Sequence, residues 1–136
     1  MQETALLVAV ETLRSNPMYQ AAEALRRQTP GGSGAMASAP QDSKEHRALL
    51  SLISTWEVIA LLLSDLKKKD KIYEVTPVCH MYRELRDGLE ALGSRVPGFG
   101  KNFAKLDKDY QAWLKKQKKD AKYISAACGG MHAKFG

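Results

Sequence analysis

Two cysteines and three histidines are the first residues that could do chemistry. Cys79 and His80 are adjacent, and Cys128 lies four residues before His132. A zinc site needs separated ligands, whereas two neighbours on a helix diverge by about 100°. Two cysteines also cannot supply a disulfide framework, so their number is typical of a reducing compartment. These residues therefore predict neither a metal site nor a cofactor.

The carboxylates and serines give no constellation for covalent or acid–base catalysis. No serine lies in the GxSxG pattern of a nucleophile elbow, and the glycine-rich stretch 93–101 lacks the Lys-Ser/Thr ending of a phosphate loop. Glu57 lies inside an apolar segment, where burial could raise the pKa of its carboxyl. Such a carboxylate more often lies at the edge of the apolar stripe and pairs with a lysine. We therefore expect no catalytic residue and predict that the protein is not an enzyme.

Lysines are concentrated late in the chain, where residues 101–122 carry eight lysines against three aspartates. The whole chain has a net charge of +6. Basic residues interleaved with aromatics, here Trp113 and Tyr123, are typical of nucleic-acid-binding surfaces. The alternative is a solvated helix face with the aromatics in the core, and arginine is absent from residues 101–136. The candidate nucleic-acid-binding residues are Lys115, Lys116, Lys118, Lys119 and Lys122.

The segment 48–66 is the element around which the rest must be arranged. Its apolar residues recur at steps of three and four, which predicts an α-helix buried on most sides. Asp42 and Glu45 precede it as a capping pair. Lys67–Lys69 follow it, and their positive charges are favourable at the carboxyl end of a helix. Glu57 and Asp65 interrupt the apolar run, so a membrane span is not expected. The stripe consists of Leu49, Leu52, Ile53, Trp56, Ile59, Ala60, Leu63 and Leu66.

Two further amphipathic helices follow this segment. Thr76 and Pro77 form a cap-then-proline start for a helix that ends near Gly93, and a loop over 95–100 precedes another helix from Lys101. The connector 70–75 is expected to be irregular or a single turn. No segment alternates with period two for long enough to form a sheet. The fold class predicted is all-α, a three- to four-helix bundle over residues 42–128, with a tail over 129–136.

Residues 1–30 predict two short helices that meet at Asn16-Pro17, where asparagine is a good N-cap and proline suits the first helical position. Isolated helices of this length are marginal in water. We therefore expect this segment to dock on the bundle. Its apolar anchors are Leu6, Leu7, Val10, Leu13, Met18 and Leu25.

Residues 31–41 separate the two parts. Gly31-Gly32-Ser33-Gly34 has the composition of a flexible linker. Followed by Ala35-Met36-Ala37, it resembles an engineered junction between two coding segments. The alternative is a natural loop. The interpretation favoured is a partner fragment over 1–30, joined by this linker to the bundle.

The function predicted is protein–protein interaction. The bundle is expected to act as an adaptor or scaffold that binds an amphipathic helical segment of a protein partner in an apolar groove, with Trp56 in the groove and residues 1–30 representing the partner. It would belong to an intracellular multiprotein complex, in the nucleus rather than the cytoplasm. The alternative is a basic helical domain that binds nucleic acid through residues 101–122.

Overall fold

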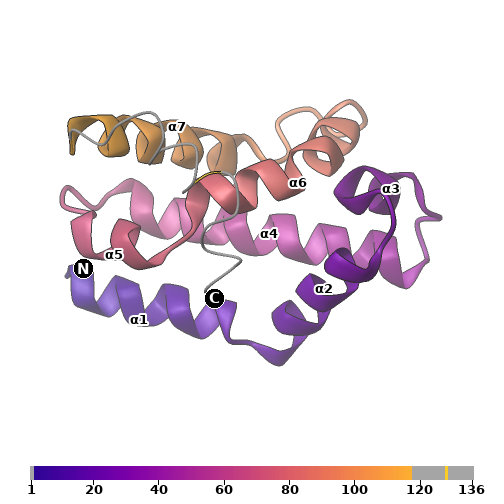
Figure 1. The fold of residues 1–136 in the computed structure, drawn as a ribbon, viewed down its shortest axis with the longest axis horizontal. Coiled ribbons are helices and arrows are strands. Elements are labelled where there is room, and N and C mark those ends of the chain that lie inside the picture. The colour runs from indigo at the N-terminus through magenta and orange to yellow at the C-terminus, as the bar shows by residue number, and fades with distance from the viewer. Residues whose placement is uncertain (1, 118–127, 129–136) are drawn as a thin grey trace.

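The computed structural model describes residues 2–117 and 128. Every regular element in this part of the chain is a helix, and the helices pack as a bundle (Figure 1), which confirms the all-α prediction. The elements are α1 (Glu3–Arg14), α2 (Pro17–Gln28), α3 (Gly32–Ser38), α4 (Lys44–Ser64), α5 (Asp70–Val75), α6 (Val78–Gly93) and α7 (Lys101–Lys116).

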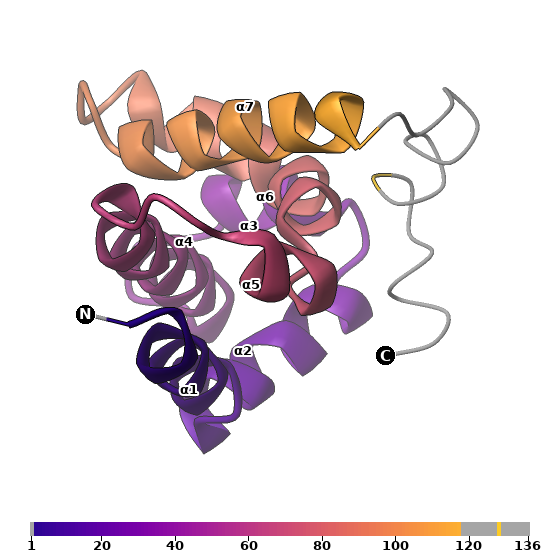
Figure 2. The same ribbon diagram turned by 90° about the vertical axis from the view of Figure 1, so that its left-hand side faces the viewer.

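Helix α4 is the centre of the bundle, as its apolar stripe predicts. It contacts α1, α2, α3, α6 and α7. In Figure 2, α7 crosses one side of the bundle and α1 and α2 cover the opposite side. By length and mean hydropathy (1.5) α4 would also qualify as a membrane-crossing helix, a test that the core helix of a bundle passes equally well. Its buried stripe faces the other helices here, from Leu49 to Leu63.

The break between α1 and α2 follows from two adjacent residues. The side chain of Asn16 accepts a hydrogen bond from the backbone N–H of Met18 at 2.8 Å, and Pro17 occupies the first position of α2. Because proline has no N–H to lose at that position, the chain can end one helix and begin another within three residues.

Residues 31–41 differ from the flexible linker that we expected, because they contain α3. Gly31 and Gly32 have φ of 87° and 63°, a backbone region that favours glycine, and they start the helix instead of leaving it loose. Met36 and Ala37 are fully buried, and α3 packs against α6 and α4. The small residues of this stretch therefore serve close packing. Whether the segment is natural or engineered stays a prediction.

Two expected helix starts are wrong by one residue. Ser43, not Asp42, caps α4, and its hydroxyl accepts from the backbone N–H of His46 at 3.2 Å. Pro77 stands at the N-cap position of α6 without a side-chain bond, while the Thr76 hydroxyl is buried and has no partner among the described residues. In both cases the chain enters the helix where the tertiary packing places it.

Glu57 joins α4 to α7. Its carboxylate accepts from the backbone N–H of Phe103 at 2.7 Å and from Asn102 Nδ2 at 2.9 Å. A carboxylate is favourable at the amino end of a helix, where backbone N–H groups lack partners. The expected lysine pairing of Glu57 is therefore replaced by capping of α7.

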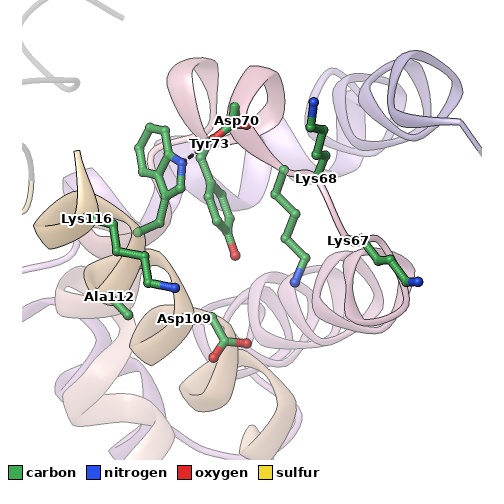
Figure 3. A pocket seen from close by; sticks show the side chains of 9 residues that line it. Lys67, Lys68, Asp70, Tyr73, Asp109, Ala112 and Lys116 are labelled. Atoms are coloured by element: carbon green, nitrogen blue, oxygen red, sulfur yellow. Dashed lines mark hydrogen bonds between the residues drawn. The ribbon is translucent and has the colours of Figure 1, made fainter.

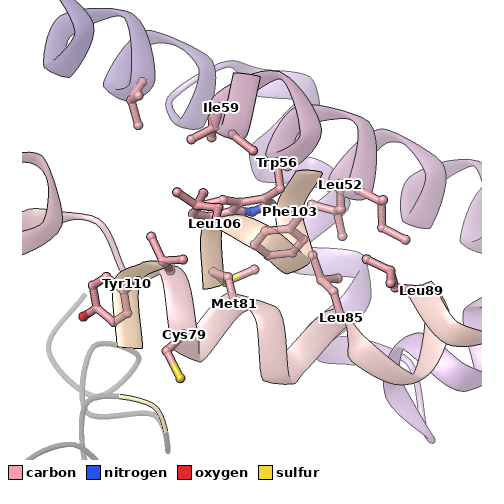
Figure 4. Close-up of a cluster of buried hydrophobic side chains, with 14 of the residues drawn as sticks. Leu52, Trp56, Ile59, Cys79, Met81, Leu85, Leu89, Phe103, Leu106 and Tyr110 are labelled. Carbon is pink, nitrogen blue, oxygen red and sulfur yellow. The ribbon is translucent and has the colours of Figure 1, made fainter. Parts of the chain in front are cut away.

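The core is one apolar cluster to which each of the helices α1 to α7 contributes. Figure 4 shows its centre, where Trp56 of α4 meets Phe103 of α7 with ring centroids 5.1 Å apart and planes 18° from parallel. At one edge, Cys79 of α6 forms a disulfide with Cys128, which corrects the expectation of two reduced cysteines. The fold brings the two residues together across a separation of 49 positions, which no local pattern reveals.

Candidate interaction interface

Helices α1 and α2 form an interface with α4 and its neighbours, which we call the N-terminal interface. Leu6 and Val10 of α1 and Ala22 of α2 are buried in it. At its end, the Glu3 carboxylate accepts from the backbone N–H of Lys71 in α5 at 2.8 Å. The first thirty residues therefore lie on the bundle along both of their helices.

Trp56 of α4 is held at this interface by a hydrogen bond to α2. Its side chain is fully buried, and its indole N–H donates to the Tyr19 hydroxyl of α2 at 3.1 Å. Burial, together with the charge of Glu23, raises the pKa of Tyr19 to about 12, so the hydroxyl is neutral at physiological pH. A buried indole usually finds a partner for its N–H, and here that partner comes from the N-terminal segment.

A buried ionic group closes the other end of the interface. The guanidinium of Arg26 in α2 donates to Glu23 at 2.7 Å and to Glu84 of α6 at 2.9 Å. Arg26 and Glu23 are buried, so each charge depends on the other for compensation. His80 lies 4.0 Å from Glu84, but burial lowers its pKa, which favours the neutral imidazole at neutral pH. Arg26 is therefore the cation that links α2 to α6.

The predicted anchors divide into three groups. Leu6 and Val10 are buried, and Leu7, Leu13 and Leu25 are half-buried. Met18 is wrong as an anchor, because 77% of it is exposed.

The face of α2 that packs on the bundle is turned by one residue from the expected one. It presents Tyr19, Ala22, Glu23 and Arg26. A stripe drawn from apolar residues alone misses this face because a paired Glu and Arg can be buried together. The i, i+3 spacing of Glu23 and Arg26 in the sequence could have indicated that these two side chains pair on this face.

The lysine-rich face is described only in part. Lys115 and Lys116 are exposed in the last turn of α7. Lys118, Lys119 and Lys122 lie outside the described residues.

Asp107 and Cys79 are two further residues of the described part of the chain that could do chemistry. Among the described residues no group of three or more His, Cys, Asp or Glu side chains is placed to hold a metal ion. Burial raises the pKa of Asp107 to about 6, and its Oδ2 accepts from Gln111 Nε2 at 2.7 Å. The sulfur of Cys79 is bonded to the sulfur of Cys128, so Cys79 is not available as a thiolate.

Comparison of the chain with protein-family models, with curated proteins and with solved structures finds no match.

Proposed function

We propose that the protein is a non-enzymatic interaction domain, an adaptor or scaffold that binds an amphipathic helical segment on a face formed mainly by α4, with α3, α5 and Glu84 of α6 at its edges. Residues 1–30 act as the occupant of that face in this chain. The partner would be a protein segment with the same features, namely two apolar anchors, a tyrosine and a buried arginine.

The observation that supports the proposal is the combination of apolar and polar pairing at the N-terminal interface. Leu6 and Val10 supply burial, which is not directional. The bonds from Trp56 to Tyr19 and from Arg26 to Glu84 fix the register of the segment. Burial plus a few fixed polar contacts is the usual composition of a specific helix-binding surface.

The proposal is tested by cleaving residues 1–30 from the bundle and letting a free peptide of the same sequence replace them. A protease site inserted between Pro30 and Gly31, both exposed, would separate residues 1–30 from the rest without touching a helix. The covalent connection to the bundle gives residues 1–30 an effective concentration of at least about the millimolar range. An occupant of micromolar affinity is therefore saturated before cleavage and exchangeable after it. We expect a labelled 1–30 peptide to bind the cleaved protein, measured by fluorescence anisotropy.

Arg26→Ala and Arg27→Ala peptides provide a matched pair. Removing Arg26 takes away the buried guanidinium that lies 2.7 Å from Glu23 and 2.9 Å from Glu84, which costs about 3–5 kcal/mol and should weaken binding at least about 100-fold. Arg27 also lies 3.9 Å from Glu23, but its side chain is 59% exposed. An exposed ion pair contributes at most about 1 kcal/mol, so its removal should weaken binding by about five-fold or less. If the cleaved segment never exchanges, or the remainder loses its fold when the segment leaves, α1 and α2 are part of the core and the proposal fails.

The alternative function is nucleic-acid binding by the lysine-rich face. It is favoured by the exposed Lys115 and Lys116, which follow the half-buried Trp113 on α7. Affinity for an oligonucleotide should then fall steeply between about 50 and 200 mM salt, whereas binding to an apolar interface should barely respond.

We also propose an intracellular, nuclear location. The disulfide between Cys79 and Cys128 argues against it, because such bonds are rare in reducing compartments. Trapping thiols with an alkylating agent in intact cells would show which state the cysteines have at the site of action.

A further inference from the structure

An open cavity of about 310 Å³ lies away from the N-terminal interface, between the end of α4, α5 and the last turns of α7. Lys67, Lys68 and Lys69 line it from the segment between α4 and α5, and Lys116 lines it from α7 (Figure 3). In the described part of the chain none of these four ammonium groups lies within 4.0 Å of a carboxylate. Four lysines with no ion pair among the described residues therefore line one cavity, and Lys116 lies across it from Tyr73, whereas the side chains of Lys67 and Lys68 extend away from it (Figure 3).

Tyr73 contributes a buried donor to the same cavity. Its side chain comes from α5 and is only 3% exposed, yet its hydroxyl has no hydrogen-bond partner among the described residues. Burial, then the nearby charge of Asp109, raises the pKa of Tyr73, so the hydroxyl keeps its proton. A buried hydroxyl without a partner is unfavourable, and a ligand oxygen in the cavity would relieve that cost.

The two acidic residues of the lining lower its positive charge without cancelling it. Asp70 Oδ1 accepts a hydrogen bond from the indole N–H of Trp113 at 2.6 Å, which fixes the carboxylate but leaves its charge. That bond holds the ring of Trp113 at the wall of the cavity, where it also packs on Tyr73 with centroids 5.3 Å apart. The lining therefore carries four lysines against the carboxylates of Asp70 and Asp109, a surplus of two positive charges.

We propose that this cavity binds a small soluble ligand that carries a di- or triphosphate group. The four lysines outnumber the two aspartates of the lining, so an anionic ligand is favoured, and a lysine ammonium binds phosphate oxygens as a point charge. Two or three linked phosphates reach more of these lysines than a single phosphate does. The Tyr73 hydroxyl donates to one oxygen of the ligand. Trp113 and Tyr73 offer an aromatic wall to whatever group the phosphates carry, and the volume is within the range of small-ligand sites.

Titration of the full chain with inorganic pyrophosphate and tripolyphosphate, at constant ionic strength, tests the proposal. Trp113 is the reporter, because it lines the cavity whereas Trp56 is fully buried. We expect a saturable change in tryptophan fluorescence. Orthophosphate should bind at least about ten-fold more weakly, since it presents fewer charges to the lysines.

Two variants and a charge-matched control locate the site. Lys67→Gln/Lys68→Gln/Lys69→Gln should raise the Kd for pyrophosphate at least about ten-fold. The control, Lys44→Gln/Lys101→Gln/Lys105→Gln, removes the same charge from exposed positions outside the cavity and should change the Kd by less than about two-fold.

Tyr73→Phe separates a binding role from a structural one. It removes only the unpartnered hydroxyl, so the melting temperature without ligand should stay the same or rise. The Kd for pyrophosphate should nevertheless rise about three- to ten-fold.

Three results would overturn the proposal. One is the absence of a saturable response at millimolar pyrophosphate. Another is an equal loss of binding in the control triple variant, which would show diffuse attraction only. The third is tighter binding of an oligothymidylate than of tripolyphosphate with no effect of Tyr73→Phe, which would assign the lysines to a nucleic-acid surface.

Discussion

Gly88 and Gly93 lie on the same helix, and we predict that the same substitution has opposite effects at the two positions. A Cβ built on Gly88 of α6 would lie 2.7 Å from the backbone oxygen of Ser33 and 2.9 Å from Leu49 Cδ2. The backbone N–H of Gly88 also donates to the Ser33 hydroxyl at 3.0 Å. At Gly93 the added carbon would meet nothing within 4 Å. The pair therefore probes whether α3 packs against α6 as described.

The expected magnitudes combine two terms. Replacing glycine by alanine within a helix favours folding by as much as about 1 kcal/mol. Overpacking at a close contact opposes folding by about 1–3 kcal/mol, and a backbone oxygen cannot move aside as a side-chain end can. Gly93→Ala should therefore raise the free energy of unfolding, and Gly88→Ala should lower it by roughly 0–2 kcal/mol net.

Gly93 is the last residue of α6 and Gly88 lies in its interior, so the helix-propensity gain at Gly93 is at most equal to that at Gly88. The difference in the free energy of unfolding between the two variants is therefore a lower estimate of the steric term of about 1–3 kcal/mol. For a chain of this size it corresponds to roughly 4–12 °C in Tm. Urea unfolding and thermal melting followed by circular dichroism would measure it. The slope with urea should be the same in both variants, so that only stability has changed.

An equal rise of Tm in both variants would refute the reasoning. It would mean that nothing approaches Gly88, that α3 does not lie on α6, and that residues 31–41 form the flexible tether expected from their composition.

Three further predictions concern buried groups. Tyr19→Phe should lower the free energy of unfolding by about 1–2 kcal/mol in urea titrations, because it leaves the Trp56 indole N–H buried without a partner; no change would mean that water reaches this N–H. The pKa of Asp107 is raised in the folded protein, so the folded state holds a proton that the unfolded state releases between about pH 4 and 6, and stability falls as the pH rises through this window. Asp107→Asn should therefore gain about 3 kcal/mol relative to the parent between pH 4 and 7 in melting curves measured side by side, and pH profiles of the same shape for both proteins would argue against a buried acid. Reducing the bond between Cys79 and Cys128 should lower stability by about 2–4 kcal/mol, since it releases the loop between them; an unchanged Tm in dithiothreitol would contradict this.

The sequence by itself determined the features that depend on neighbours along the chain. The steps of three and four between Leu49 and Leu63 are enough to predict α4, because an amphipathic period is a property of one segment. Asn16 and Pro17 mark the break between α1 and α2 for the same reason, since a cap and the residue it serves are adjacent.

Only the tertiary structure decided what happens where distant segments meet. The glycines at 31 and 32 allow both a loose tether and a tightly started helix, and the close approach of Gly88 to Ser33 selects the second. Glu57 caps α7 across 46 positions, a contact that an apolar pattern cannot reveal.

The same reason explains why the sequence did not predict the packed face of α2 or the cavity lined by Lys67–Lys69 and Lys116. The charge of buried Arg26 is compensated by Glu23 of the same helix and by Glu84 of α6, and the second contact spans 58 positions. Lys67–Lys69 read as the polar end of a helix until the fold brings Lys116 and the hydroxyl of Tyr73 to the same cavity. Residue types set which groups can be buried or left unpaired, and the packing of helices far apart in the chain determines which of them are.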